Sequence, residues 1–390
     1  MEPAGSFRSM AMGGIGISLR DNSSIYFSNP ASYSSLDSNS FVFDFGIDYG
    51  MNFISDGASD FSSDDMNFDH LLIGFPLSKR WGFALGLLPL SNGYYKMADE
   101  VTEGDPDYDA ITGGYSSYHA GEGGFSTFFL GTGVNITRRL SAGMNIAFLF
   151  GQIKRTNQFD FADFYNVYSN NSTEKLQIGG ANFDYGLQYS APLKNDLYFN
   201  AGISLSSGKD YNSNYDHISF KYTAYSNRDT ISYISNSSAK TFIPGTLRLG
   251  VSIGKKNKFT TGIDFITTKW SDAKIPGSAG YAADTRSFLA GAEYIPDKFS
   301  NYSFIKRVEY RIGAHIEDNY LIINGEQVKE YGVSLGLGIP LRRSLSKTNL
   351  FFDFTKKTGS STNNLHNENY YTMGISLNIY DRWFLKRKFD

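Results

Sequence analysis

Long stretches of the chain alternate strictly between apolar residues and small or polar ones. In residues 140–151 the apolar side chains fall on every second position, from Leu140 to Phe150, with Ser, Gly and Asn between them. The same pattern recurs in residues 307–316, 331–341 and 371–379. A period of two is that of a β-strand with two different faces. The pattern therefore predicts an all-β protein.

The connections between these stretches alternate between short and long. Short ones lie near residues 78–80, 137–139, 192–195, 255–258, 296–298 and 342–344, and long ones near 52–66, 91–123, 156–174, 208–240, 270–283, 316–328 and 357–368. About six short turns and seven long loops imply about fourteen strands, a rhythm typical of outer-membrane proteins. We therefore predict a transmembrane antiparallel β-barrel over residues 39–381, with long extracellular loops and a basic periplasmic tail at 382–390.

The composition agrees with a barrel and excludes several classes of function. Aromatic residues make up 16% of the chain, which suits strands and membrane-interface girdles. The longest apolar run, residues 83–90, is far shorter than the roughly 18 residues of a transmembrane helix. Without cysteine there is no disulfide or thiolate metal site, and a net charge of -3 gives no case for nucleic acid. We expect no cofactor.

The start of the chain lacks the basic and apolar regions of a signal peptide. Because an outer-membrane protein needs an export signal, we expect that the signal has been removed. The protein would then lie in the bacterial outer membrane, in contact with its lipid. The alternative is a protein that is never exported.

Residues 1–38 do not alternate. They contain a small, Gly-rich run at 10–17 and a turn-forming Asn29-Pro30-Ala31. The strand faces predicted to point inward are rich in small residues, among them Gly332, Ser334, Gly336 and Gly338. Small residues leave room inside, so we predict that residues 1–38 form a plug, or hatch, in the lumen. The alternative is a disordered periplasmic leader.

The N-terminal segment resembles a known family. Residues 8–14 (RSMAMGG) followed by Asn29-Pro30-Ala31 are similar to the hatch of FadL-type outer-membrane transporters of hydrophobic compounds and of their PorV-like relatives. The strand plan and the basic ending resemble Bacteroidota members of that superfamily. The resemblance implies a fourteen-stranded barrel closed by a hatch, in which Gly13, Gly14, Asn29, Pro30 and Ala31 take part in gating.

The resemblance implies two different functions. In the transporters, hydrophobic substrates enter from outside and leave sideways through a kinked third strand. In PorV-like members the barrel is a subunit of a protein-secretion apparatus. Fold alone does not decide between them.

Pro89, in the predicted third strand, is a candidate for the lateral gate. Proline cannot donate to a strand ladder and is confined to bulges or strand ends. A bulge at Pro89, followed by Asn92 and Gly93, would open the wall sideways. Alternatively, the strand ends at Leu88 and Pro89 begins a loop.

Several charged residues are predicted to face the lumen. The candidates for a polar network are Asp44, Asp48, Arg248, Asp264, Glu309 and Arg311. A fatty-acid tunnel needs an apolar lining with few polar groups, so these residues weaken the transport interpretation. They are accommodated if they pair with one another and with the backbone of the hatch.

Other motifs are weaker. Asp105, Asp107 and Asp109 have the spacing of a calcium loop but lack its Gly and Glu, so we expect solvated acidic loops and no metal site. His70 and His315 face the lumen outside any nucleophile motif, so we expect no enzyme. Tyrosines in the long loops are typical of a binding surface and equally of an aromatic girdle.

Two functions remain. The first is passive transport of small, fatty-acid-like hydrophobic compounds, gated by the hatch. The second is a non-transporting barrel subunit of an outer-membrane protein secretion or assembly complex, whose partners would be other outer-membrane or periplasmic proteins.

Overall fold

The computed structural model describes residues 5–55, 60–161, 167–223, 226–277, 282–323, 325–341, 344–358 and 367–382. Its strands are β1 (Ser40–Ser55), β2 (Asp60–Ser78), β3 (Trp81–Asn92), β4 (Tyr95–Val101), β5 (Tyr115–Asn135), β6 (Leu140–Phe161), β7 (Ser169–Pro192), β8 (Leu197–Ser206), β9 (Lys209–Thr223), β10 (Ser226–Ile243), β11 (Thr246–Lys255), β12 (Phe259–Thr268), β13 (Thr285–Tyr294), β14 (Glu309–Ile323), β15 (Glu326–Pro340), β16 (Lys347–Thr358) and β17 (Asn367–Arg382). The helices are short: α1 (Phe7–Met10), η1 (Pro30–Ser35), η2 (Lys194–Asp196), η3 (Trp270–Asp272) and η4 (Ile305–Arg307). Within the described residues, none of them has the length and apolar character needed to cross a membrane.

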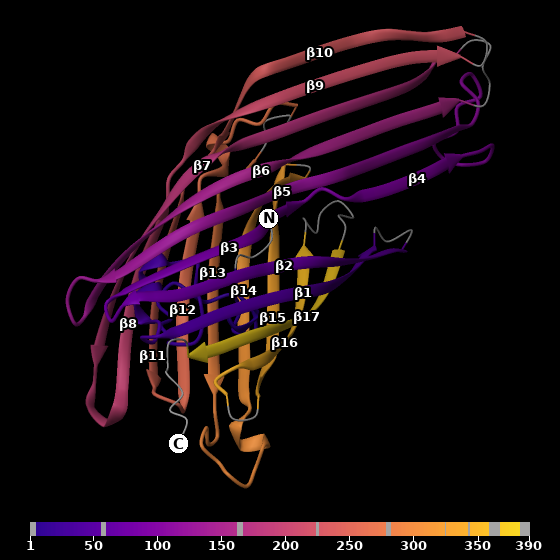
Figure 1. Cartoon of the computed structure of the whole chain (residues 1–390). Helices are drawn as coiled ribbons and strands as arrows, with labels where there is room; N and C mark the ends of the chain where they lie inside the picture. The colour runs from indigo at the N-terminus through magenta and orange to yellow at the C-terminus, as the bar shows by residue number, and fades with distance from the viewer. Residues whose placement is uncertain are drawn as a thin grey trace, which may run out of the picture.

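All seventeen segments belong to one antiparallel sheet that closes on itself, because β1 pairs with both β2 and β17. Three wall strands are each interrupted once. Segments β3 and β4 both pair with β5, and β8 and β9 both pair with β7. On the next strand, β10 pairs with β9 and β11 pairs with β8. The wall therefore has fourteen strands, which confirms the predicted barrel (Figure 1).

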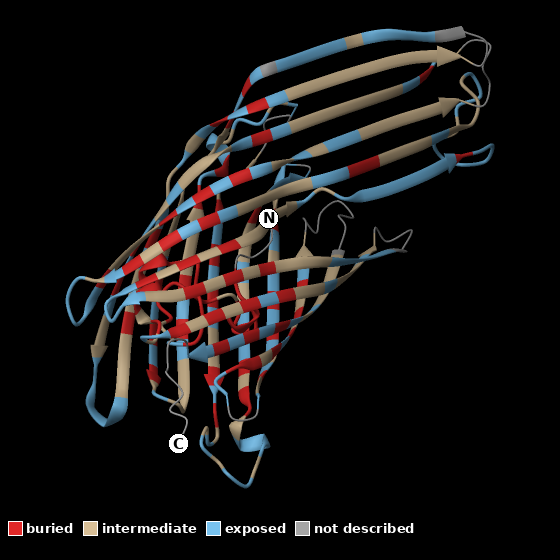
Figure 2. Cartoon of the chain, viewed as in Figure 1, coloured by how far each residue is buried: buried red, intermediate tan, exposed pale blue. Residues whose placement is uncertain are grey.

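Along the strands, inward and outward positions differ as a membrane barrel requires. On β6 the side chains of Ile146, Phe148 and Phe150 are exposed, whereas Ala147 and Leu149 between them are buried. Figure 2 shows the same alternation around the lower part of the barrel. An exposed apolar ring around a closed sheet fits the hydrocarbon core of a bilayer, in which every backbone group must be paired.

Much of what the sequence predicts as long loops is strand. Strands β5, β6 and β7 have 21, 22 and 24 residues, about twice the 9–11 that a membrane crossing needs. Together with β4, β9 and β10 they extend beyond the barrel as a sheet that we call the blade (Figure 1). The loops predicted within 91–123, 156–174 and 208–240 were therefore wrong in large part. In water both faces of a strand can be polar, so the blade lacks the alternation that marks the wall.

The short connections lie together at one end of the barrel, which we call the turn end; the blade lies at the loop end. One predicted short turn is longer than expected, since residues 295–308 between β13 and β14 include η4. The predicted tail falls almost entirely outside the described residues, because β17 ends at Arg382.

Residues 5–38, which we call the lumenal segment, lie against the inner faces of strands around the ring at the turn end. Phe7, Met12, Ile15 and Ile17 are each at most 1% exposed. Backbone meets backbone closely here. Glycines of the wall at which an added Cβ would lie within 2.5 Å of the lumenal segment are Gly82, Gly133, Gly143, Gly186, Gly202, Gly291, Gly313 and Gly336. The small residues of the strands thus make room for this segment.

Candidate functional site

Arg8 of α1 joins the lumenal segment to the barrel wall. Its guanidinium donates to both carboxylate oxygens of Glu293 on β13, at 2.7 and 3.0 Å. It also lies 2.8 Å from the carboxylate of Asp21. Burial alone would raise the pKa of Asp21, but Arg8 and Lys347 hold it well below its usual range. Paired charge-assisted bonds of this kind are among the stronger polar contacts in proteins.

Two predicted network residues, Glu309 and Arg311, continue this cluster on β14. Arg311 donates to Glu293 at 2.8 Å and contacts Glu309, whose carboxylate also lies 3.2 Å from Lys347 on β16. With Arg8 and Asp21, the cluster contains three cations and three anions. The charges of this cluster therefore balance, and the cluster joins the lumenal segment to strands β13, β14 and β16.

Asp264 on β12 also contacts the lumenal segment. Its Oδ2 accepts hydrogen bonds from the backbone N–H groups of Gly16 and Ile17, at 2.7 and 2.9 Å. We call the inner faces of β12, β13, β14 and β16 the charged wall. Its carboxylates bind the segment at two separate places, through Arg8 and through this backbone turn.

The other predicted network residues lie apart from the charged wall. Asp44 accepts from Asn378 at 3.3 Å and lies 3.3 Å from His70, while Arg248 donates to Ser206 at 2.8 Å. Asp48 is half-buried on β1. The six predicted residues therefore form separate groups and not one network, since Asp44 and Arg248 pair with side chains of neighbouring strands and Asp264 with the backbone of the lumenal segment.

Asn29 connects the lumenal segment to two neighbouring strands. Its Nδ2 donates to the carbonyl oxygens of Ile17 at 2.8 Å, Leu187 at 3.2 Å and Ile203 at 3.3 Å. Its Oδ1 accepts from the N–H of Ala31 at 3.2 Å, which caps η1, with Pro30 at the first helical position. This geometry explains why the triplet stands out in the sequence.

Gly13 and Gly14 form a tight turn at the end of α1. Their φ angles are +70° and +88°, a region that favours glycine. The N–H of Gly13 donates to Ser334 Oγ on β15 at 2.9 Å. A Cβ added at Gly313 on β14 would lie 1.9 Å from that same nitrogen. Glycines on both sides therefore let the two backbones touch.

Pro89 lies at an irregularity in the wall. The ladder between β2 and β3 has seven residue pairs and ends at Leu71–Leu87, short of the 9–11 residues of a membrane crossing. Beyond that pair, β2 continues beside β1, and β3 continues beside β5 with a register shift between Pro89 and Ser91. The structure thus has the bulge at Pro89 and not a strand end.

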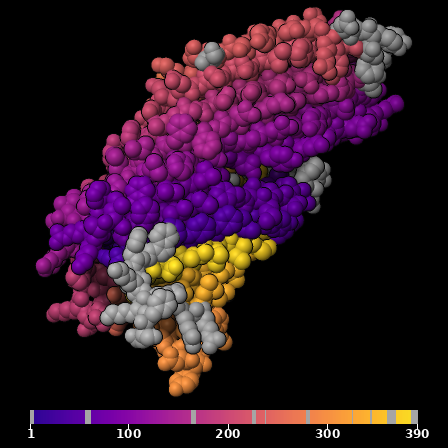
Figure 3. All heavy atoms as spheres, viewed as in Figure 1, coloured from indigo at the N-terminus to yellow at the C-terminus, as the bar shows by residue number. Residues whose placement is uncertain are grey.

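Above the end of this ladder, the described residues of β2 and β3 share no further backbone pairs and are linked through side chains. Asn92 Nδ2 donates to Asn67 Oδ1 at 3.3 Å, and Gly93 N–H pairs with Gly123 on β5. Figure 3 shows a narrow hollow in the surface between the indigo β2 and the purple strands above it. We call the interruption between residues 68–70 and 88–91 the lateral opening.

An apolar cluster lies behind the lateral opening, beside the buried His70 and Asp44. Leu72 and Phe129 are buried beside Phe27 of the lumenal segment, with Leu88 packed against them. Leu149 belongs to a second apolar cluster towards the blade, packed with Leu90 of β3. We call these clusters the apolar wall. Sequence reasoning missed it, although the unbroken apolar run at 83–90 signals a strand that is apolar on both faces.

The aspartates of the acidic loop and the two histidines have ordinary structural partners. Asp105 accepts from the N–H of Thr102, and Asp109 from that of Ile111, as in ordinary turns. Across the described residues, no group of three or more His, Cys, Asp or Glu side chains is placed to hold a metal ion. His70 is buried against Asp44 and Asp69, and His315 contacts Thr355.

Comparison with solved structures supports the fold. The chain is similar to a toluene transporter of P. putida, TodX, with 14% identity, a TM-score of 0.63, and coverage of 99% of this chain and 100% of that one. It is similar to a Pseudomonas aeruginosa FadL homologue (13% identity, TM-score 0.63, 98% and 99% covered) and to the CymD monoaromatic hydrocarbon channel (13%, 0.62, 97% and 98%).

The comparisons with known sequences give a family but no curated relative. No curated protein matches the chain. The predicted likeness to FadL-type barrels holds for the fold, while a PorV-like role and a Bacteroidota source stay predictions. One family model, BamG, matches residues 1–390, and the chain therefore belongs to the BamG family.

Proposed function

We propose that the protein carries small hydrophobic compounds passively across the outer membrane. The observation that carries this proposal is the lateral opening, which begins within the membrane-crossing part of the wall because the β2–β3 ladder has only seven pairs. An apolar solute at the apolar wall can leave there directly into lipid. Transport needs no energy source, since partitioning into hydrocarbon is itself favourable.

The lumenal segment acts as the hatch in this proposal. It is held on the turn-end side of the lumen by Arg8, Asp264 and Asn29. A solute that arrives from the loop end is therefore blocked by the lumenal segment at the turn end and can leave through the lateral opening. Removal of residues 1–38 is expected to turn the barrel into an ion-conducting pore in planar bilayers.

The charged lumen does not oppose this route. Glu293 and Arg311 of the charged wall are paired and Asp44 lies 3.3 Å from His70, whereas Leu72, Leu88 and Phe129 lie behind the lateral opening. The names of the similar structures, a toluene transporter and a monoaromatic hydrocarbon channel, refer to small apolar solutes. We infer the same broad class here and extend it to fatty-acid-like compounds.

A cross-link across the lateral opening tests the proposal. The double variant Asn67→Cys/Asn92→Cys places two thiols where the side chains now form their 3.3 Å hydrogen bond. The chain has no other cysteine, so a short, reducible bis-methanethiosulfonate reagent reacts only there. Because β2 and β3 can then no longer move apart, uptake of labelled toluene or fatty acid by expressing cells should fall and should recover on reduction.

A matched pair provides the control. Asn52→Cys/Ser63→Cys joins directly paired residues of the intact β1–β2 ladder. The same reagent should leave uptake unchanged in this variant. Equal uptake by the cross-linked and reduced forms of the first variant would exclude the lateral route.

The blade favours a second candidate function, as a subunit of an outer-membrane complex. Along the described residues, β10 pairs with β9, and its other edge has only an isolated bridge between Phe242 and Lys274. Ile231 and Tyr233 on this strand are 57% and 69% exposed. Unpaired edges with exposed apolar side chains favour association with another chain.

Purification in mild detergent distinguishes the two functions. A stoichiometric partner that remains bound, and is lost when Ile231 and Tyr233 are both changed to Lys, would support the subunit role. A lone barrel with full uptake activity would support transport alone.

A further inference from the structure

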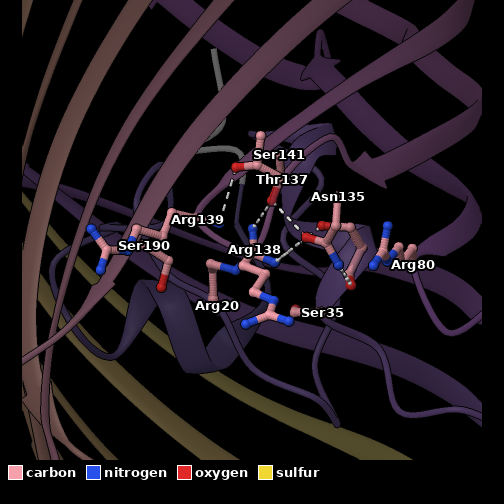
Figure 4. A pocket seen from close by; sticks show the side chains of 10 residues that line it. Arg20, Ser35, Arg80, Asn135, Thr137, Arg138, Arg139, Ser141 and Ser190 are labelled. Atoms are coloured by element: carbon pink, nitrogen blue, oxygen red, sulfur yellow. Dashed lines mark hydrogen bonds between the residues drawn. The ribbon is translucent and has the colours of Figure 1, made fainter.

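A second polar site lies at the turn end, away from the charged wall. A cavity of about 320 Å³ opens where the lumenal segment meets the β2–β3 and β5–β6 turns. Four arginines line it: Arg20, Arg80, Arg138 and Arg139. Figure 4 shows these side chains around the cavity, with Asn135 and hydroxyl groups between them. We call it the arginine pocket.

Arg20 is the inner residue of the pocket, and its hydrogen-bond partners within the described part of the chain are neutral. Its guanidinium donates to Ser141 at 2.7 Å, Gln188 at 3.1 Å, Ser34 at 3.1 Å and Asn135 at 3.2 Å. The neighbouring carboxylate, Asp21, is turned away and engaged by Arg8. Burial without an opposing charge lowers the pKa of Arg20 to about 10. The pocket thus fixes a guanidinium in place and leaves its charge uncompensated.

The other three arginines add positive charge without an acid. Arg80 lies in the β2–β3 turn, and Arg138 and Arg139 in the β5–β6 turn; all three are exposed. Throughout the described ranges, none of the four arginines is within 4.0 Å of a carboxylate oxygen. None of the residues that line the pocket is acidic. Like charges gathered this closely repel one another unless an anion lies between them.

We propose that the arginine pocket binds a phosphate group. Guanidinium groups match the geometry of phosphate, and several of them together favour a multivalent anion. Thr137 supplies a hydroxyl donor beside the arginines, because its Oγ1 accepts from the N–H groups of Arg139 and Leu140 and keeps its own hydrogen for a ligand. The phosphate comes either from solution or from the headgroup of a lipid in the adjacent leaflet. The site is separate from the lateral opening, so it does not depend on the transport proposal.

Titration calorimetry of the purified full chain tests the proposal. The protein is held in a maltoside detergent, which carries no phosphate, and inorganic phosphate is added at low ionic strength. We expect one saturable site. The variant Arg138→Gln/Arg139→Gln changes only exposed turn residues, so the barrel should fold. It should weaken binding at least about tenfold, because two charge-assisted contacts are lost.

The control variant removes the same charge elsewhere. Lys255→Gln/Lys256→Gln lies at the β11–β12 turn, and it should leave phosphate binding unchanged. Absence of saturable binding by the unmodified protein would overturn the proposal, as would equal weakening in both variants.

Two further ligands identify the source of the phosphate. If soluble dihexanoylphosphatidic acid binds at least about tenfold more tightly than inorganic phosphate, the occupant is a lipid headgroup; equal affinity indicates free phosphate. Either result supports a phosphate site. Binding of a Glu-rich peptide that phosphate does not displace would overturn it and assign the pocket to an acidic protein.

Discussion

The two sides of the lumen differ in how they hold the chain. The charged wall binds the lumenal segment through directional contacts: Glu293 with Arg8, and Asp264 with two backbone N–H groups. The apolar wall packs against the segment through Phe27 and its neighbours, with Asn145 of β6 as a hydrogen-bonded link to Phe27 and Tyr33. It contains no ion pair to the segment among the described residues, so its contacts depend more on burial than on charge. The charged wall therefore holds the segment through buried ion pairs, and the apolar wall holds it mainly through packing.

The strands of the two walls also differ in how far they pair with their neighbours. Strand β13 pairs with β12 along its whole length, from Thr285 to Tyr294, and with β14 from Arg286 to Tyr294. Strands β2 and β3 both continue past their last shared pair, Leu71–Leu87. The wall is thus continuous at β13, which carries Glu293, and interrupted between β2 and β3, where Leu72 and Leu88 lie beside His70. For the proposed transport, the lining at the interruption matters more than the average polarity of the lumen.

The largest expected effect comes from breaking the charged wall at Glu293. Its carboxylate is 3% exposed and accepts from both Arg8 and Arg311. Glu293→Ala leaves two buried guanidinium groups short of a partner, which typically costs about 3–5 kcal/mol. We expect the lumenal segment to leave its place, so that single channels in planar bilayers conduct ions.

Glu122→Ala is the control, because Glu122 forms an exposed pair with Lys154 at 3.9 Å. It should not change conductance, since exposed pairs contribute little. A closed Glu293→Ala channel would show that the charged wall does not hold the segment.

A somewhat smaller effect is expected where the backbones touch. Gly313→Ala places a Cβ 1.9 Å from the nitrogen of Gly13, so β14 and the lumenal segment must move apart. Such overpacking costs about 1–3 kcal/mol. Thermal unfolding followed by circular dichroism should show a lower midpoint, whereas Gly179→Ala, with nothing within 4 Å, should not. Equal midpoints would mean that the segment adapts freely.

The sequence predicts only part of the contrast between the charged wall and the apolar wall. Alternation in residues 140–151 and 331–341 predicts the barrel, because lipid imposes a period of two on any strand that crosses it. In the blade both faces meet water, so the sequence carries no such period and the strands were predicted as loops. The individual lumen charges were predicted, but not which of them meet. Pairing depends on register between distant strands, as between Glu293 and Arg8.

Asn29→Asp tests the contact between the lumenal segment and the strands β7 and β8. Aspartate keeps the cap of η1 but replaces the Nδ2 donor by an acceptor that faces three carbonyl oxygens. Buried polar groups left unpaired cost about 1–3 kcal/mol each. We expect faster cleavage of the segment by protease added from the turn end.

Asn301→Asp, at an exposed position, is the matched control and should be cleaved at the normal rate. If Asn29→Asp were equally resistant, the amide would not be what joins the segment to the wall on that side.

The smallest expected effect on stability is at Pro89, in the interrupted part of the wall. Pro89→Ala restores an N–H at the bulge, and exchanges of this kind change stability by less than about 1 kcal/mol. The added donor allows β3 to pair more regularly, so the lateral opening should narrow and uptake of labelled toluene should fall while the unfolding midpoint stays nearly constant. Pro192→Ala, at the exposed end of β7, should change neither quantity. A loss of stability without a loss of uptake would mean that Pro89 shapes the strand and not the opening, and the contrast between the two walls would then concern only how the lumenal segment is held.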